Sequence, residues 1–481
     1  MSTTPPLLDA RTLKWLPWVV AIAFFMQSLD GTILNTALPS MARSLSEDPL
    51  RMQSVIIAYM LTIALLIPAS GWIADRFGIK RIFFGAILLF SFGSLLCALS
   101  ESLSMLVGAR VIQGLGGALM MPIGRLIVLR AYPRSELVRI MSFITVPGLL
   151  GPLLGPTLGG WLVEYLSWHW IFLLNIPVGI LGCYAVMHVV PDLEGGARTR
   201  FDGIGFALFG ASMVLITIAL EGLGELHLPV LRVVFLLFAG MGCLAAYWLR
   251  AGNVEFPLFA PSLFRTRTFA VGILGNLFSR LGSGALPFLV PLLLQIALGY
   301  TPSQAGMSMI PLAAAAMFAK SVARWLIERL GYRIILTGNT LLLGIFLAGI
   351  ALVDAQTPYW LLLIHLAILG AINSLQFTAM NTVTLIDLDD ASAASGNSLL
   401  SVVAQLSLSL GVACAAALLG GFTAQVSTGE VSSVLGAFQL TFLAVGVLAI
   451  LASGIFLQLS PTDGRKSAPP PTPRPEPEIE A

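Results

Sequence analysis

Fourteen long apolar segments constrain this sequence of 481 residues more than any other feature. A helix needs about 20 apolar residues to cross a bilayer, and each segment is about that length or longer. The segments are 15–38, 52–74, 82–100, 103–129, 139–163, 169–190, 203–222, 230–249, 269–297, 304–327, 334–353, 359–385, 396–421 and 434–458. Charged residues make up only 10% of the chain, too few to cover the surface of a soluble protein. The sequence therefore predicts an all-α polytopic membrane protein and argues against a soluble enzyme.

Lysines and arginines are distributed unevenly between the connecting loops. In the loops on one side of the predicted membrane there are only Arg43 and Arg51, whereas the termini and the loops on the other side contain most of the 26 basic residues. Basic residues accumulate on the cytoplasmic side of membrane proteins. We therefore expect both termini in the cytoplasm and an even number of spans.

A repeated motif divides the chain into two halves. GWIADRFGIKR at 71–81 follows the second segment, and RWLIERLGYRI at 324–334 follows the tenth. Shifting the sequence by 253 residues aligns Asp75 with Glu328 and Gly78 with Gly331. Parallel repeats of this kind are typical of transporters with a site between the halves. The predicted parts are a cytoplasmic N-terminus (1–14), a six-span half (15–190), an inserted peripheral helical pair (203–249), a second six-span half (269–458) and a disordered cytoplasmic tail (459–481).

Five motifs occur in order along the first half: LDGTILNTALP (29–39), GWIADRFGIKR (71–81), ARVIQGLGGALM (109–120), GLLGPLLGPTLGGW (148–161) and WHWIFLLNIPVG (168–179). Together they resemble the motifs of the major facilitator superfamily, and more narrowly those of its fourteen-span drug:proton antiporters. The resemblance implies the major facilitator fold, with two six-helix halves and two additional central helices. It also implies a bacterial inner-membrane location and transport of small molecules driven by protons, without another cofactor. The lipid bilayer is the expected surrounding, no nucleic acid is expected as a partner, and a monomer is expected.

The loop after the second segment combines two glycines with four charged residues: Gly71, Asp75, Arg76, Gly78, Lys80 and Arg81. We expect Gly71 to permit close helix approach and Gly78 to permit a tight turn. The charges alone would serve as a topology anchor. The resemblance implies a second role, a conformational switch that latches the two halves and releases them for inward opening.

The fifth segment contains a run of small residues and prolines: Gly148, Gly151, Pro152, Gly155, Pro156, Gly159 and Gly160. Glycines four residues apart let a neighbouring helix approach closely. Tight packing is one interpretation. The resemblance implies another, the antiport signature of the family at the interface between the halves.

Asp30 is the only acidic residue deep within a predicted span. Burial favours the neutral form of a carboxyl group and a nearby arginine favours its charged form, so a residue between these influences can load and release a proton. The resemblance implies that Arg110 and Gln113 of the fourth span take part in proton coupling with Asp30. A permanent structural pair is the alternative.

Arg280 and His169 lie within the predicted spans and carry separate hypotheses. Arg280 lies near the middle of the ninth span, and we interpret it as a candidate for the substrate cavity because intramembrane charges default to functional roles. His169 replaces the arginine that is usual in the family pattern W-R-W-x-F. Either an external pH sensor or an interfacial histidine between tryptophans would explain it.

The sequence favours a secondary active transporter that exports small amphipathic compounds in exchange for protons. No P-loop is present, so ATP is not the expected energy source. A transporter of a specific metabolite or organic anion on the same fold is the alternative. A membrane-embedded enzyme is disfavoured, because the four histidines are scattered and form no metal-binding motif.

Overall fold

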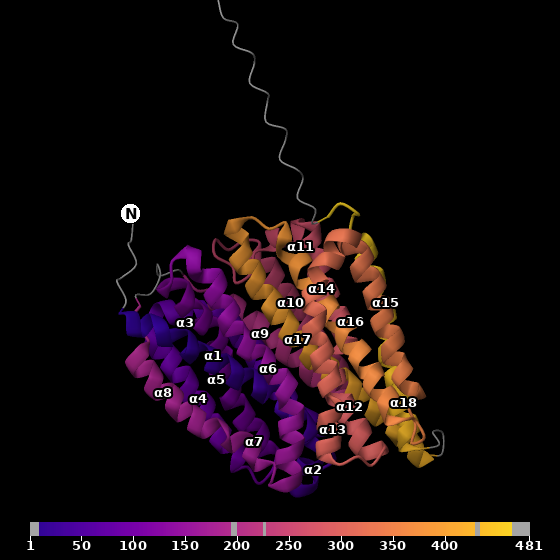
Figure 1. Ribbon diagram of the computed structural model, residues 1–481. Helices are drawn as coiled ribbons and strands as arrows, with labels where there is room; N and C mark the ends of the chain where they lie inside the picture. The colour runs from indigo at the N-terminus through magenta and orange to yellow at the C-terminus, as the bar shows by residue number, and fades with distance from the viewer. Residues whose placement is uncertain (1–8, 194–199, 225–227, 429–432, 464–481) are drawn as a thin grey trace, which may run out of the picture.

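The computed structural model describes residues 9–193, 200–224, 228–428 and 433–463. Within these ranges fourteen helical segments are long and apolar enough to cross a membrane, which confirms the predicted all-helical, fourteen-span architecture (Figure 1). The residues of the predicted tail beyond 463 lie outside the described part. Its first residues are ordered, because the Asp463 carboxylate accepts hydrogen bonds from the Ser460 N–H and from Arg267.

The N-terminal half consists of six spans. The first helix begins at Ala10, inside the segment predicted as a terminus, and a short 3-10 turn (Leu34–Thr36) extends it. The helices are α1 (Ala10–Ile33), α2 (Leu38–Leu45), α3 (Gln53–Phe77), α4 (Ile79–Ala98), α5 (Leu103–Ala131), α6 (Arg134–Tyr165), α7 (His169–Leu173) and α8 (Asn175–Val189). Here α2 is a short connecting helix, and α7 and α8 together form the sixth span.

The C-terminal half repeats this arrangement. Its helices are α11 (Arg267–Ser283), α12 (Leu286–Leu292), α13 (Pro302–Ser308), α14 (Ile310–Leu330), α15 (Tyr332–Gly349), α16 (Tyr359–Ile386), α17 (Asp390–Thr428) and α18 (Val434–Ala452). Short 3-10 or π turns accompany them at Pro261–Arg265, Leu293–Ala297, Ile350–Leu352 and Ser453–Gln458. The ninth span is broken between α11 and α12, and the tenth is broken between α13 and α14. Each pair still forms one membrane-spanning segment.

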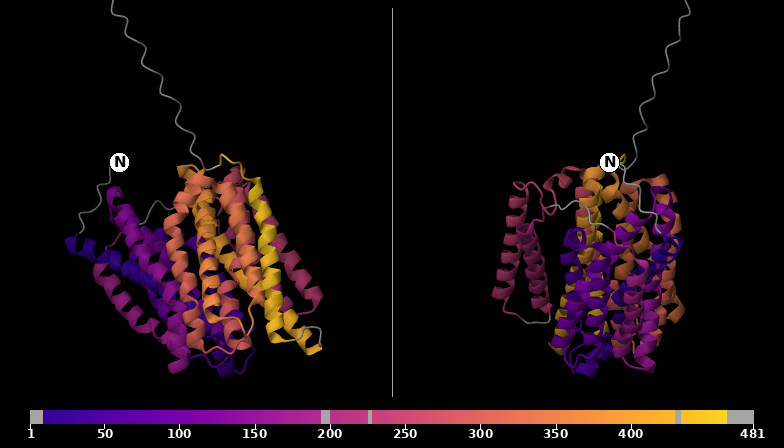
Figure 2. Two further views of the ribbon diagram at one scale, coloured as in Figure 1. Left: turned by 45° about the vertical axis from the view of Figure 1, so that its right-hand side comes forward. Right: turned by 90° about the vertical axis from the view of Figure 1, so that its left-hand side faces the viewer.

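The inserted pair consists of α9 (Gly203–Gly224) and α10 (Val230–Ala251) and stands to one side of the bundle (Figure 2). The helix α9 packs against α17 of the C-terminal half and against α3 of the N-terminal half, while α10 packs mainly against α9. At one end, Phe201 of the preceding linker stacks on Trp72 of α3, with ring centroids 4.9 Å apart. The pair therefore covers one of the seams between the two halves.

We call the two ends of the bundle the basic end and the opposite end. The basic end contains the loop after α3 and the residues Arg76, Lys80, Arg130 and Arg333, and the opposite end contains α2, α7 and α13 (Figure 1). The two halves lean apart toward the basic end and converge at the opposite end (Figure 2).

The repeat in the sequence has a counterpart in the backbone. Gly78 ends α3 with φ +90° and Gly331 ends α14 with φ +80°, in the region that side chains rarely adopt. These are the two glycines that the shift between halves aligns. A sharp turn follows the second helix of each half because glycine is present there.

We predict that Gly78→Ala destabilises the protein by about 1–3 kcal/mol, because a Cβ would meet no atom within 4 Å but would strain the backbone. Thermal unfolding of the purified protein in detergent measures the effect. Gly85→Ala is the matched control, since its Cβ also enters open space but within the regular helix α4. Equal melting temperatures for the two variants would contradict the prediction.

Candidate functional site

A buried ion pair joins the first and fourth spans. Arg110 Nη1 on α5 lies 2.7 Å from Asp30 Oδ2 on α1, and both residues are only 1% exposed. The family resemblance linked these two side chains in proton coupling, and the structure brings them into direct contact. Helical rise puts Asp30 about 27 Å along its span from Thr12 and about 9 Å before the end of that span at Thr36.

Amide side chains complete the coordination of the carboxylate. Gln113 Nε2 and Asn175 Nδ2 both donate to Asp30 Oδ1, at 2.8 and 3.1 Å. The hydroxyl of Ser94 accepts from the same two amides, at 2.9 and 2.8 Å. Asp30 therefore accepts three hydrogen bonds, one from a guanidinium and two from side-chain amides.

The guanidinium of Arg110 is equally well enclosed. Its Nη1 also donates to Gln113 Oε1 at 2.6 Å, and its Nε donates to the Val55 carbonyl at 3.3 Å. The ring of Tyr59 lies 4.0 Å from the guanidinium carbon, within the range of a cation–π contact. We call Asp30, Arg110, Gln113, Ser94 and Asn175 the Asp30 cluster. Removing a partner from a buried pair costs about 3–5 kcal/mol, so adding a proton to Asp30 would disturb the whole cluster.

Sequence reasoning identified three members of this cluster and missed Ser94 and Asn175. Asn175 lies within the motif WHWIFLLNIPVG, so its position in a polar break of an apolar segment was a usable signal. Ser94 gives no such signal, because serine within a span commonly bonds to its own helix.

A second buried arginine occupies the C-terminal half. Arg280 on α11 is 4% exposed, its Nε donates to Asn276 Oδ1 at 3.0 Å, and its guanidinium carbon lies 3.9 Å from the ring centroid of Phe377 on α16. It lies apart from the Asp30 cluster, in the other half of the molecule.

One face of α6 packs against α1 through the predicted glycines. A Cβ at Gly151, Gly155 or Gly159 would overlap atoms of residues 28–36, whereas at Gly148 it would make ordinary contacts. The hydroxyl of Thr32 donates to the Gly151 carbonyl at 3.2 Å. The hydroxyl of Thr36 donates to the Pro156 carbonyl at 3.1 Å. The helix runs without interruption through Pro152 and Pro156.

The adjacent face of α6 meets the C-terminal half at the opposite end. A Cβ at Gly160 would overlap the Pro302 carbonyl of α13, and a Cβ at Gly306 of α13 would overlap the Pro156 carbonyl. Near these contacts, the Glu164 carboxylate accepts from the Ser303 N–H at 2.9 Å. Neither Glu164 nor Ser303 was identified from the sequence. Glycines on both helices thus allow the two halves to touch through their backbones.

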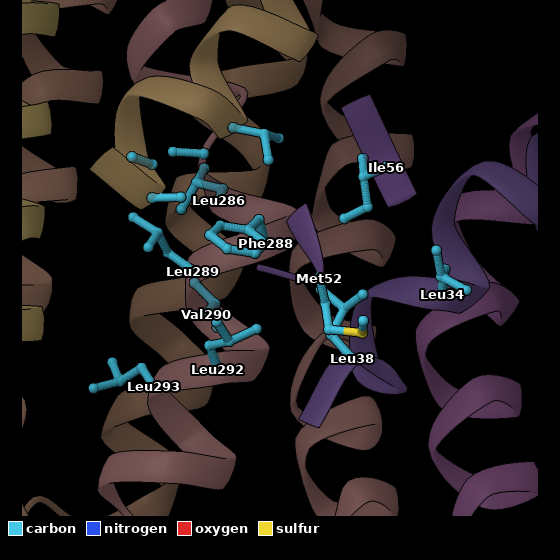
Figure 3. Packing of buried hydrophobic residues seen from close by; sticks show 14 of the residues in the cluster. Leu34, Leu38, Met52, Ile56, Leu286, Phe288, Leu289, Val290, Leu292 and Leu293 are labelled. Carbon is cyan, nitrogen blue, oxygen red and sulfur yellow. The ribbon is translucent and has the colours of Figure 1, made fainter. Parts of the chain in front are cut away.

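An apolar cluster extends this contact between the halves. It includes Leu38 and Met52 of the N-terminal half together with Phe288, Val290 and Leu292 of α12, and Figure 3 shows these side chains close to one another. Gln295 Nε2 also donates across the interface to the Thr36 carbonyl, at 3.0 Å. The opposite end is closed by backbone contact, hydrogen bonds and apolar packing together.

In the predicted switch loop, the ion pair of Asp75 lies within the N-terminal half. Asp75 Oδ1 accepts from Arg130 Nη2 of α5 at 2.9 Å, a contact within the N-terminal half. The equivalent Glu328 pairs with Arg324 of its own helix, at 2.8 Å. Arg76 lies in the last turn of α3, and Lys80 and Arg81 lie in the first turn of α4. Gly71 does not mediate a close approach, because a Cβ there would enter open space, and this expectation was wrong for the conformation observed.

His169 lies beside a tryptophan near the opposite end. Its ring stacks on that of Trp168, with the centroids 3.8 Å apart, at the start of the short helix α7. Among the described residues, no group of three or more His, Cys, Asp or Glu side chains is arranged to hold a metal ion.

We predict that Gly160→Ala separates the two halves at the opposite end, because the new methyl group would overlap a backbone carbonyl that no rotamer change can move. Spin labels at the exposed Ser104 and Gln356 would report a longer distance than in the unsubstituted protein. Gly148→Ala is the matched control and should leave the distance unchanged. A distance distribution that is the same in both variants would refute the role of Gly160.

A family model described as Major Facilitator Superfamily matches residues 20–412 and, in a second overlapping match, residues 274–480. The solved structures that resemble the chain include a bacterial homologue of the human lysosomal transporter Spinster (TM-score 0.67, 17% identity, 94% of this chain and 97% of that one). Another is a POT family transporter in complex with a thioalcohol conjugated peptide (TM-score 0.68, 17% identity, 92% and 95%). At these identities the likeness shows the fold alone.

Relatives of much higher identity match almost the full length. Three of them carry the name "Putative multidrug resistance protein MdtD". That of Pectobacterium atrosepticum is 47% identical over 95% of this chain and 98% of the relative. That of Pectobacterium carotovorum is 48% identical over 94% and 96%, and that of Serratia proteamaculans is 47% identical over 93% and 94%. The chain therefore belongs to the Major Facilitator Superfamily and is a multi-pass membrane transporter rather than an enzyme.

Proposed function

We propose that this protein exports small amphipathic compounds across the bacterial cytoplasmic membrane in exchange for protons. The observation that carries the proposal is the Asp30 cluster, a carboxylate and a guanidinium buried together within the membrane-spanning region. Intramembrane acidic residues with a defined partner are typical of proton relays in transporters. The names of the relatives, which refer to multidrug resistance, support export of more than one compound.

We further propose that the basic end faces the cytoplasm, in keeping with the distribution of lysine and arginine. The closed opposite end would then face outward, and the structure would represent a conformer open toward the cytoplasm. One chain supplies both halves of the central site, so a monomer suffices for transport.

The α1–α6 contact links proton binding to the closed end. Ser28 and Leu29, adjacent to Asp30, touch Gly151 of α6, and Thr32 bonds to the carbonyl of the same residue. Five and nine residues farther along, α6 contacts α13 through Pro156 and Gly160. A proton on Asp30 would weaken its attraction to Arg110, allow α1 to shift, and transmit that shift through α6 to the interface between the halves.

We predict that Asp30→Asn abolishes pH-gradient-driven accumulation of substrate, because an amide cannot exchange a proton. Downhill exchange of substrate should persist, since it needs no net proton movement. The measurement is transport in proteoliposomes with and without an imposed pH gradient.

The matched control is Glu47→Gln, which removes a carboxylate from a surface pair with Arg51 near the opposite end. It should leave both activities intact. If Asp30→Asn still accumulates substrate with an unchanged pH profile, then Asp30 is structural and coupling occurs elsewhere.

For the switch loop, we propose that Asp75 exchanges its contact with Arg130 for a contact with the C-terminal half when the basic end closes. Asp75→Asn should then slow turnover several-fold while substrate affinity changes by no more than a few-fold. Rates and binding are measured separately, by transport in proteoliposomes and by equilibrium binding in detergent.

Glu328→Gln removes the equivalent carboxylate of the C-terminal half, whose pair with Arg324 is exposed and lies within one helix. It should change neither quantity. Lost affinity with normal turnover in Asp75→Asn would exclude the switch role.

A further inference from the structure

We propose that Arg280 binds the carboxylate of aromatic, amphipathic organic anions, which makes such anions a substrate class of this transporter. The inference rests on the proposed transport function and names the chemistry that one half of its site recognises. The supporting observations are the contacts, charge balance and orientation of Arg280 and of its aromatic neighbour Phe377.

One edge of the Arg280 guanidinium is occupied and another is not. Nε donates to Asn276 Oδ1 at 3.0 Å, and the Asn276 amide is itself oriented because Nδ2 donates to the Gly272 carbonyl at 3.1 Å. In contrast, Nη2 is buried and has no hydrogen-bond partner among the described residues. Asn276 thus acts as a positioning residue that holds the guanidinium with its Nη2 edge available.

Within the described part of the chain, no carboxylate balances the charge of Arg280. No described carboxylate lies within 4.0 Å of it, whereas Arg110 pairs with Asp30 at 2.7 Å. Both arginines lie against an aromatic ring, Arg110 on Tyr59 and Arg280 on Phe377, at 4.0 and 3.9 Å. Each half therefore buries a guanidinium on an aromatic face, but only the N-terminal half supplies the carboxylate. A buried charge is strongly destabilising without a partner, and a substrate anion would provide one.

Phe377 lies on the side of α16 that faces α11, because its ring contacts the Arg280 guanidinium there. It is 42% exposed, while Ile364 and Ile368 of the same helix are 50% and 39% exposed. Nine residues separate Phe377 from Ile368, so helical geometry places the two on opposite sides of α16, about half a turn apart. The exposed surface of Phe377 is therefore on the side of α16 that faces Arg280, opposite to that of Ile368, and this is where we place the apolar part of the substrate.

These features together select one kind of ligand. A guanidinium presents its N–H groups as a planar fork that fits a carboxylate through two parallel hydrogen bonds. Next to this fork, Phe377 offers an aromatic surface on which the apolar part of the same molecule can stack. A cationic compound would be repelled by Arg280, and a neutral amide would lose the charge-assisted bonds.

The test is equilibrium binding to the purified full-length protein in nanodiscs, without any pH gradient. The probes are two matched pairs, 2-naphthoate with 2-naphthamide and indole-3-acetate with indole-3-acetamide. The unsubstituted protein should bind each carboxylate about tenfold or more tightly than its amide, the size expected for charge-assisted hydrogen bonds. In Arg280→Met this preference should disappear for both pairs. Arg232→Met, which removes an exposed guanidinium from α10, should retain it.

Arg280→Lys is a second variant that tests the proposal if Arg280→Met does not fold. It keeps the charge without the planar fork, so it should retain only part of the preference. The proposal is overturned if the unsubstituted protein shows no carboxylate preference in either pair, or if folded Arg280→Met keeps it in full. Because no gradient is applied, a positive result stands even if Asp30→Asn shows that proton coupling occurs elsewhere. Conversely, gradient-driven transport without a carboxylate preference supports the transport function and refutes this inference.

Discussion

The ion pair between Asp30 and Arg110 is the interaction on which the organisation of the N-terminal half depends. Hydrocarbon offers no water to either charge, so each is tolerated only in the presence of the other and of polar neighbours that satisfy their remaining hydrogen bonds. Ser94 and Asn175 contribute from α4 and α8, and Tyr59 contributes its ring from α3. One pair of charges thereby fixes the positions of five helices relative to one another. A change in its protonation therefore alters contacts of all five helices.

The helix α6 connects this charged centre to the interface between the halves. Its glycines do not act as one stripe. Gly151, Gly155 and Gly159 bring α6 against α1, while Gly160 faces α13. Backbone contacts on both faces leave little side-chain volume to absorb a displacement, because closely packed surfaces transmit shifts instead of damping them. The run of glycines and prolines therefore does more than permit tight packing: it lets α6 transmit a displacement of α1 to α13.

Much of this architecture is predictable from the sequence because the bilayer imposes strong local rules. Short stretches of sequence are enough to predict the length of each span, the charge of each loop and the repeated loop around Gly78 and Gly331. The partners of individual side chains are not, because they depend on which helix faces share an interface. The sequence shows neither that Ser94 completes the Asp30 cluster nor that Asp75 contacts Arg130. It also cannot show that Gly71 has open space beside it in this conformation. The same limit explains why Arg280 was identified only as a candidate, since its lack of a counter-charge becomes visible only when its surroundings are known.

The placement of the inserted pair affects how lipid-dissolved molecules can reach the interior. Because α9 lies along both α17 and α3, it shields the seam between the halves on that side of the bundle from acyl chains. The seam on the other side is formed by α6 with α13 and α14, and the inserted pair stands away from it (Figure 2). The two sides of the bundle therefore differ: the inserted pair covers the seam between α3 and α17, whereas the seam bordered by the glycine-rich helix α6 is not covered by that pair.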